Sequence, residues 1–301
     1  MMIAALNLLA MLVLGAWLAA TFDRMAPALW GGRARGPLAA LADGAAMLTR
    51  PATGTEKPDA MLRIGAPLLY LVLAAVGLAV VPIGPAGALI ESPVGIVIWG
   101  SCEALIVIAV FMHGWAPNSP FPLIGAYRYA AIALPVMLPS MFVLIAAAIP
   151  AESLSVTAIV ESQREVWNVV RQPLGLPLFV LVGLTLTLRG PMDYADGLDL
   201  AGGTSAEQGG RGRALWQMAR LAMLVAFSGM AAAVFLGGPL GPVLPGPVWL
   251  WLKTALIMAV VVVLGQAVGR TPPANMLKLL WVFGLPISFL HLVAAGALAL
   301  W

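Results

Sequence analysis

Charged residues are scarce in this chain of 301 residues. They make up 10% of it, whereas hydrophobic residues make up 61% and the mean hydropathy is +0.98. A soluble domain carries roughly 25% charged residues, so the composition excludes a soluble globular enzyme. Apolar runs recur from Ile3 to Trp301, which excludes a single membrane anchor. The runs are continuous, unlike the alternating segments of about ten residues found in β-barrels. The sequence therefore predicts an all-α polytopic membrane protein.

Residues that carry cofactor and active-site chemistry are scarce too. The single cysteine, Cys102, excludes an intrachain disulfide and a cysteine-rich iron–sulfur site. The two histidines, His113 and His291, are far apart and do not form a metal-binding pattern. No phosphate-binding glycine motif and no nucleophile–base pair is recognisable. We therefore expect no catalytic centre and no metal site in this chain alone.

Eight apolar stretches predict about eight transmembrane helices in a single domain over 1–301. The first contains no Lys or Arg, so we expect a span there rather than a cleavable signal peptide. The fifth is short for a bilayer about 30 Å thick, and an earlier start near Val170 is the alternative. The stretches are 3–22, 64–83, 93–113, 129–150, 174–189, 214–236, 249–269 and 279–300.

The distribution of basic residues predicts the orientation. Thirteen of the 16 Lys and Arg residues lie in or beside four loops, whereas Arg164, Arg171 and Lys253 lie on the other side. Cytoplasmic loops are enriched in Lys and Arg, so both termini are predicted to face outward from a bacterial inner membrane. This bias explains the pI near 9.4 without a nucleic-acid partner. The predicted inner loops are 23–63, 114–128, 189–213 and 270–278.

The outer segment 151–173 has apolar residues spaced for an amphipathic helix at the membrane surface.

Four candidates are ionisable residues in or at the ends of predicted spans: Glu103, Lys253, His291 and His113. Glu103 is the clearest, because an acid there costs roughly 2.5–3.5 kcal/mol and marks a functional candidate. It is either a proton carrier or a neutral acid bonded to a neighbouring helix. Lys253 either joins a buried proton chain or extends to the interface. We expect His291 to be packed and hydrogen-bonded, and His113 to be interfacial.

The predicted inner loops hold the remaining candidates. Asp193, Asp196, Asp199 and Glu207 gather in loop 189–213, either as an ordinary solvated loop or as a like-charge cluster. The glycine-rich part, 203–213, is typical of a mobile segment. In the first loop, Asp23, Arg24, Arg33, Arg35 and Asp43 stand close together.

Several segments, taken in order, form a recognisable series. The most specific is GWAPNSPFPLIGAYR, from Gly114 to Arg128. The others are Asp23-Arg24 with RARGP at 33–37 and Ala42-Asp43, SLSVTAIVESQ at 153–163, PMDYADGLDLAGGTSAEQGG at 191–210, FLGG at 235–238 followed by Lys253, and GRTPPANMLKLLW…LP at 269–286. Together they resemble the membrane subunit 1 family of respiratory complex I, which includes the H subunit of bacterial NADH–quinone oxidoreductase. The same family supplies a membrane subunit to group 4 energy-converting hydrogenases and formate hydrogenlyases.

The resemblance implies a role in a larger oxidoreductase complex. This chain would anchor the peripheral redox arm and couple electron transfer to proton or cation translocation. Iron–sulfur clusters, and nickel–iron in a hydrogenase-type complex, would reside in partner subunits. Antiporter-like membrane subunits, hydrogenase-like or quinone-site subunits and membrane lipid would be its neighbours. The chain would bind no cofactor itself, and quinone would bind, if at all, at the inner-face interface. A hydrogenase-type complex is slightly favoured, and the alternatives are a true NADH–quinone oxidoreductase or a non-pumping scaffold.

The cost of placing charge in a membrane span and the resemblance together assign the candidate residues. The proton-path or coupling residues are Glu103, Asp193, Asp196, Asp199, Glu207 and Lys253. The residues of the redox-arm docking or quinone-headgroup face are Arg24, Arg33, Arg35, Asp43 and Arg128. Where the family has a glutamate in the fourth span, this chain has Pro135-Val136-Met137. We therefore hypothesise that Glu103 replaces that carboxylate.

Overall fold

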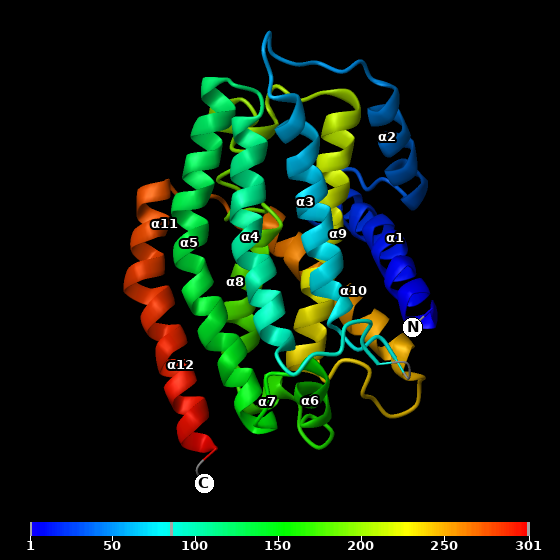
Figure 1. The fold of residues 1–301 in the computed structure, drawn as a ribbon, viewed down its shortest axis with the longest axis vertical. Coiled ribbons are helices and arrows are strands. Elements are labelled where there is room, and N and C mark those ends of the chain that lie inside the picture. The colour runs from blue at the N-terminus through cyan, green and yellow to red at the C-terminus, as the bar shows by residue number, and fades with distance from the viewer. Residues whose placement is uncertain (1, 85–86, 300–301) are drawn as a thin grey trace.

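The computed structural model describes residues 2–84 and 87–299, and within them all regular structure is helical (Figure 1). The helices are α1 (Met2–Met25), α2 (Pro37–Thr49), α3 (Ala60–Ala79), α4 (Gly95–Trp115), α5 (Pro120–Ala148), α6 (Val156–Glu161), α7 (Asn168–Arg171), α8 (Gly175–Leu186), α9 (Gly210–Leu236), α10 (Gly246–Ala267), α11 (Pro273–Leu279) and α12 (Leu285–Leu298). A π-helical turn, Leu280–Gly284, joins α11 to α12. Within the described residues, 7 helical segments are long and apolar enough to cross a membrane. The prediction of an all-α polytopic membrane protein is confirmed.

Helix α9 is the centre of the bundle. It packs against α1, α2, α3, α8 and α10, and 89% of its most apolar window is buried, compared with 28% for α1. Its second half contains four alanines, a serine and a glycine, and such small residues let helices approach closely in a membrane. At Gly183 on α8, the ring of Phe227 from α9 leaves no room for a Cβ atom.

The fifth predicted span, 174–189, is not a full-length span. Helix α8 has 12 residues, so it rises about 18 Å against a hydrocarbon core of about 30 Å. Gln172 leaves the helical conformation and Pro173 follows it, which separates α8 from α7. At the other end, the chain turns at Leu188, whose φ is +53°. The irregular end at Leu188 is tolerated because it lies against protein rather than lipid, and Leu188 is 1% exposed.

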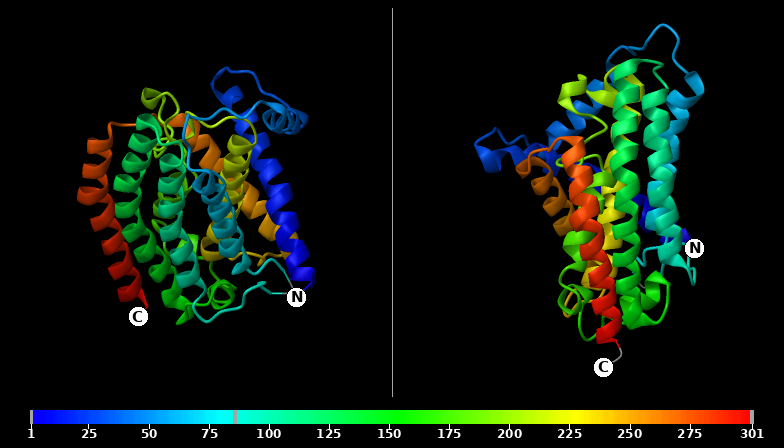
Figure 2. Two further views of the ribbon diagram at one scale, coloured as in Figure 1. Left: turned by 45° about the horizontal axis from the view of Figure 1, so that its top comes forward. Right: turned by 90° about the vertical axis from the view of Figure 1, so that its left-hand side faces the viewer.

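The two ends of the bundle differ in character. Both termini lie at one end, which we call the termini end, while α2 and the segment before α9 lie at the other, the loop end (Figure 2). This arrangement agrees with a topology that puts both termini on one side. That the loop end faces the cytoplasm stays a prediction from the charge bias.

The segment 151–173 contains two short helices, α6 and α7, which pack against α9 at the termini end. Val156, Ile159 and Val160 are buried. The amide of Gln163 donates to the Ala233 carbonyl at 2.9 Å, and that of Asn168 donates to the Val234 carbonyl at 2.9 Å. The segment therefore closes the end of α9 as part of the bundle.

Candidate coupling site at the loop end

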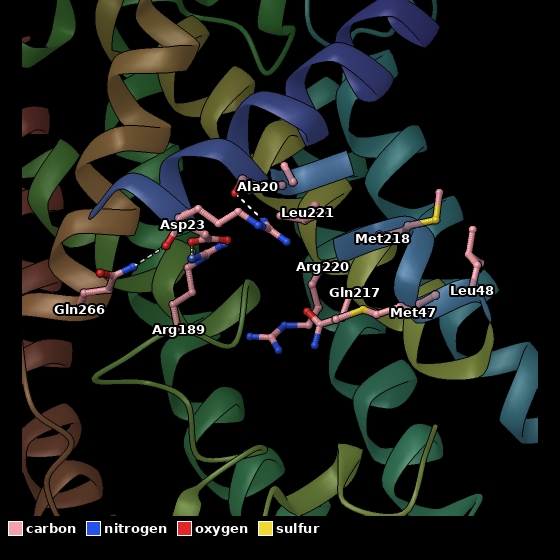
Figure 3. Close-up of a pocket in the computed structure, with 14 residues that line it drawn as sticks. Ala20, Asp23, Met47, Leu48, Arg189, Gln217, Met218, Arg220, Leu221 and Gln266 are labelled. Carbon is pink, nitrogen blue, oxygen red and sulfur yellow. Dashed lines mark hydrogen bonds and ion pairs between the residues drawn. The ribbon is translucent and has the colours of Figure 1, made fainter. Parts of the chain in front are cut away.

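A cavity of about 410 Å³ lies at the loop end between α1, α2, α9 and α10 (Figure 3). Figure 3 shows Asp23, Arg189 and Gln266 on one side of it and Met47, Leu48 and Met218 on the other. The remaining lining residues are Ala20, Arg24, Ala40, Gly44, Ala214, Gln217, Arg220 and Leu221. The cavity thus combines an apolar wall with a charged wall.

Two ion-pair groups hold the charged wall in place. Arg189, in the turn after α8, donates to Asp23 of α1 from both terminal guanidinium nitrogens, at 2.5 and 2.8 Å. Arg24 of α1 donates to Asp43 of α2 at 3.0 Å, and Arg35 donates to the same carboxylate at 2.9 and 3.1 Å. The hydrogen bond from Arg24 is the main reason that the pKa of Asp43 lies below its usual value. These pairs fasten α2 and the turn after α8 to the end of α1.

One donor in this wall is unused. The Nε atom of Arg189 is buried and has no hydrogen-bond partner in the described part of the chain. A buried donor without a partner costs free energy, so this Nε weakens the stability of the wall.

The acids of the predicted inner loop are paired with separate arginines. Asp196 lies 3.2 Å from Arg220 and accepts a hydrogen bond from Thr204 at 2.5 Å. Because Arg220 also lines the cavity, it connects that cavity to Asp196 directly.

Asp199 forms a second group with arginines that are distant in sequence. It lies 2.5 Å from Arg128 and 2.7 Å from Arg270, and Arg270 also approaches Asp193 at 4.0 Å. The hydrogen bond from Arg128 is the main reason that the pKa of Asp199 is lowered. A lowered pKa is opposite to the shift expected in a like-charge cluster. Arg128 therefore sits with the acidic loop, away from Arg24, Arg35 and Asp43, whereas Arg33 is exposed.

The rest of this loop packs against the bundle, whereas its glycine content predicted a mobile segment over 203–213. Gly203, Thr204 and Ser205 form a buried 3₁₀ turn, and Gly210 begins α9. Glu207 accepts a hydrogen bond from Ser119, at the start of α5. The loop therefore covers the ends of α4 and α5.

Glu103 is 1% exposed and lies between α4 and α5. Its carboxylate accepts hydrogen bonds from Trp99 on its own helix and from Ser140 on α5, the latter at 2.7 Å. Within residues 2–84 and 87–299, no salt bridge reaches it, and no chain of side-chain hydrogen bonds joins it to the four loop acids. The structure thus places a buried carboxylate in the bundle core, apart from the loop-end site.

Lys253 lies at the opposite end of the bundle from the loop acids. It is 5% exposed, and its ammonium donates to the carbonyls of Leu236, Gly238 and Leu240 at 2.5, 3.0 and 2.6 Å. It also lies 4.2 Å from the centre of the Trp167 ring. An ammonium has three donors, and all three are used here. Lys253 therefore stabilises the C-terminal end of α9 as a positive cap.

We expect Lys253→Met to lower the free energy of unfolding by about 2–4 kcal/mol, because it leaves three carbonyl oxygens without a donor. Thermal unfolding of the purified protein in detergent measures the loss. Lys278→Met is the matched control, since Lys278 is exposed. An unchanged melting temperature combined with lost ion transport would instead assign Lys253 to the proton path.

The surroundings of the two histidines differ from those predicted from the sequence. His113 is fully buried and stacks on Trp216, with ring centres 3.6 Å apart, so it is not interfacial. His291 is packed, but its Nε2 atom has no hydrogen-bond partner in the described residues. Across those residues there is also no group of three or more His, Cys, Asp or Glu side chains able to hold a metal ion.

Comparisons with known proteins identify the family of this chain. A family model described as NADH dehydrogenase matches residues 1–296. The chain belongs to this family. It is 34% identical over 262 residues to the NADH-quinone oxidoreductase H subunit numbered 1 in Rhodopseudomonas palustris strain HaA2, covering 87% of this chain and 82% of that protein. The values are the same for the H subunit numbered 2 in strain ATCC BAA-98 / CGA009 and for the one numbered 1 in strain BisB5. The resemblance drawn from the motifs is confirmed.

The position of Glu103 can be compared with the segment of α5 where the family resemblance predicts a glutamate. Val136 stands in the segment where the resemblance led us to expect a family glutamate, and it is fully buried on α5. Ser140, which donates to Glu103, follows Val136 by one helical turn. The Glu103 carboxylate thus reaches the same stretch of α5 from the neighbouring helix.

Sequence reasoning missed several residues of the cavity. Gln217 and Gln266 carry no motif, and nothing in the sequence marked them. Helix α2 lies in a segment that the sequence analysis assigned to a loop. Pro37 in its first turn and the apolar residues after it are typical of a helix start and could have predicted it.

Proposed function

We propose that this chain is the membrane subunit of a complex I-like oxidoreductase of the NADH–quinone type in a bacterial inner membrane. It anchors the peripheral redox arm and couples electron transfer to proton translocation. Electrons stay in partner subunits that carry iron–sulfur clusters, and this chain supplies charge and proton pathways. The observation that carries the proposal is the loop-end cavity, whose charged wall is tied through Arg220 to Asp196.

The cavity suits a quinone as substrate. Small-molecule pockets span roughly 300–1,000 Å³ and combine apolar walls with a few polar groups. Met47, Leu48 and Met218 offer apolar contact for an isoprenoid tail, while the side-chain amide of Gln217 offers a donor for a quinone oxygen. These features support the quinone-headgroup role predicted for Arg24 and Asp43, which hold this wall together.

Coupling follows from electrostatics at the cavity. Reduction of a quinone consumes two electrons from the redox arm and two protons, and negative charge develops on the headgroup oxygens. That charge attracts Arg220 away from Asp196, which changes the proton affinity of Asp196. Asp193, Asp199 and Glu207 extend the ionisable groups along the same face, and Glu103 is the carrier within the membrane.

Docking of the redox arm uses the rest of the loop end. Arg33, Arg50, Lys57, Arg211 and Arg213 are exposed there. Exposed arginine and lysine side chains attract an acidic partner surface and fix its orientation. The long apolar faces of the outer helices remain for antiporter-like membrane subunits and lipid.

A second candidate is a scaffold that does not pump. In the described residues, no series of side-chain hydrogen bonds connects Glu103 to the loop acids. This gap favours the scaffold. A hydrogenase-type complex is the third candidate, and its partners would contain nickel.

Isolation of the native complex through a tag on this chain tests the proposal. We expect iron–sulfur subunits to co-purify and the preparation to reduce quinone with NADH. Nickel together with iron would indicate the hydrogenase type. A chain that purifies alone and without metal would contradict the proposal.

A further inference from the structure

A second cavity lies at the termini end, far along the bundle from the first. It has a volume of about 590 Å³ and lies between α12 and the junction of α7 with α8. Its wall is mostly apolar, with two basic side chains, and its principal residues are Arg171, Leu174, Ile287, Leu290, His291 and Leu298.

Arg171 is a cation without a partner among the described residues. Of the three basic residues on this side, Arg164 pairs with Glu161, and Lys253 is held by three carbonyls. Within residues 2–84 and 87–299, the guanidinium of Arg171 forms neither an ion pair nor a hydrogen bond. A half-buried arginine beside an apolar groove lacks an anion that would satisfy its donors.

His291 of α12 lies at the bottom of the groove. It lines the same groove and is only 7% exposed, yet its Nε2 atom has no partner in the described structure. Gly175 faces it so closely that a Cβ there would lie 3.3 Å from Nε2. This close contact shows that Nε2 faces α8 and not the open groove, so His291 forms the floor of the groove and leaves the headgroup contact to Arg171.

The apolar part of the groove is open and follows α12. Leu290 is 64% exposed and Leu298 is 68% exposed. In a membrane subunit these side chains face hydrocarbon, so an acyl chain can lie along them from the end of the bundle inward.

We propose that this groove is a binding site for an anionic phospholipid. The phosphate binds Arg171, and one acyl chain lies against Leu290 and Leu298. The positive charge of Arg171 selects an anionic headgroup over a zwitterionic one, because the second carries its own compensating cation.

Lipid titration of the purified complex tests this site. The complex is placed in phosphatidylcholine nanodiscs and titrated with phosphatidylglycerol, and bound lipid is counted by native mass spectrometry. We expect Arg171→Gln to weaken phosphatidylglycerol binding about tenfold, the size of one charge-assisted hydrogen bond. Arg164→Gln is the matched control and keeps the wild-type affinity. Equal affinity of both variants, or no preference over phosphatidylcholine, would overturn the proposal.

Cross-linking gives a second measurement that needs no change at Arg171. A benzophenone amino acid replaces Leu290, and the complex is irradiated in its native membrane. An adduct whose mass matches a phosphatidylglycerol supports the site. An adduct with another membrane protein would show that a partner helix covers the groove and would overturn it.

Discussion

Glu103→Gln is expected to stop proton translocation while the complex still assembles and reduces quinone. The amide keeps the volume of the side chain and can still accept the hydrogen bond from Trp99. It cannot bind and release a proton, however, and loss of a positioned proton-transfer group slows that step by about a hundredfold or more. Acidification of proteoliposomes during quinone reduction measures the effect.

The control for this variant is Glu165→Gln, which neutralises an exposed acid in the segment between α6 and α7. It should translocate protons at the wild-type rate. If Glu103→Gln also translocates at that rate, Glu103 is a neutral acid bonded between α4 and α5, and the replacement hypothesis fails.

Gly44→Phe is expected to block the loop-end cavity. Gly44 lines that cavity, and a Cβ atom built on it meets nothing within 4 Å, so an aromatic ring can enter the open space. We expect the KM for a short-chain quinone to rise at least about tenfold, which corresponds to about 1.4 kcal/mol of lost binding. Helix α2 should not be weakened, because glycine is the poorer helix former.

Ala46→Phe adds the same ring to the same helix, at an exposed position outside the cavity lining. Its KM should stay at the wild-type value. Equal effects of the two variants would indicate that α2 docks a partner subunit and that the cavity does not hold quinone.

The long helices could be predicted because lipid imposes one requirement on all of them. Each must carry about twenty apolar residues, and that requirement is visible without any contact information. Helix α8 and segment 151–173 lie against the bundle instead, so their length is set by tertiary packing. Gln163 and Asn168 show this, because their partners on α9 are 70 and 66 residues away in sequence.

The sequence was sufficient to predict several residues of the candidate site, but not which of them bind one another. Glu103 could be identified because acids are rare in the apolar spans, and in the structure its side chain is buried. Its partner Ser140 lies 37 residues away, and the arginines that bind Asp199 lie 71 residues away on either side. Proximity in sequence suggested a cluster of acids, whereas the fold distributes them among arginines. Lys253 was ambiguous for the same reason, since only the structure shows the three carbonyls around it.

The central claim is that chemistry in the loop-end cavity drives proton movement through this subunit. Its most direct test is the simultaneous measurement of quinone reduction and proton uptake by the wild-type complex in proteoliposomes. We predict acidification of the lumen that begins with quinone addition and collapses with a protonophore. Quinone reduction at full rate with no pH difference across the membrane would contradict the account and leave the chain as a scaffold.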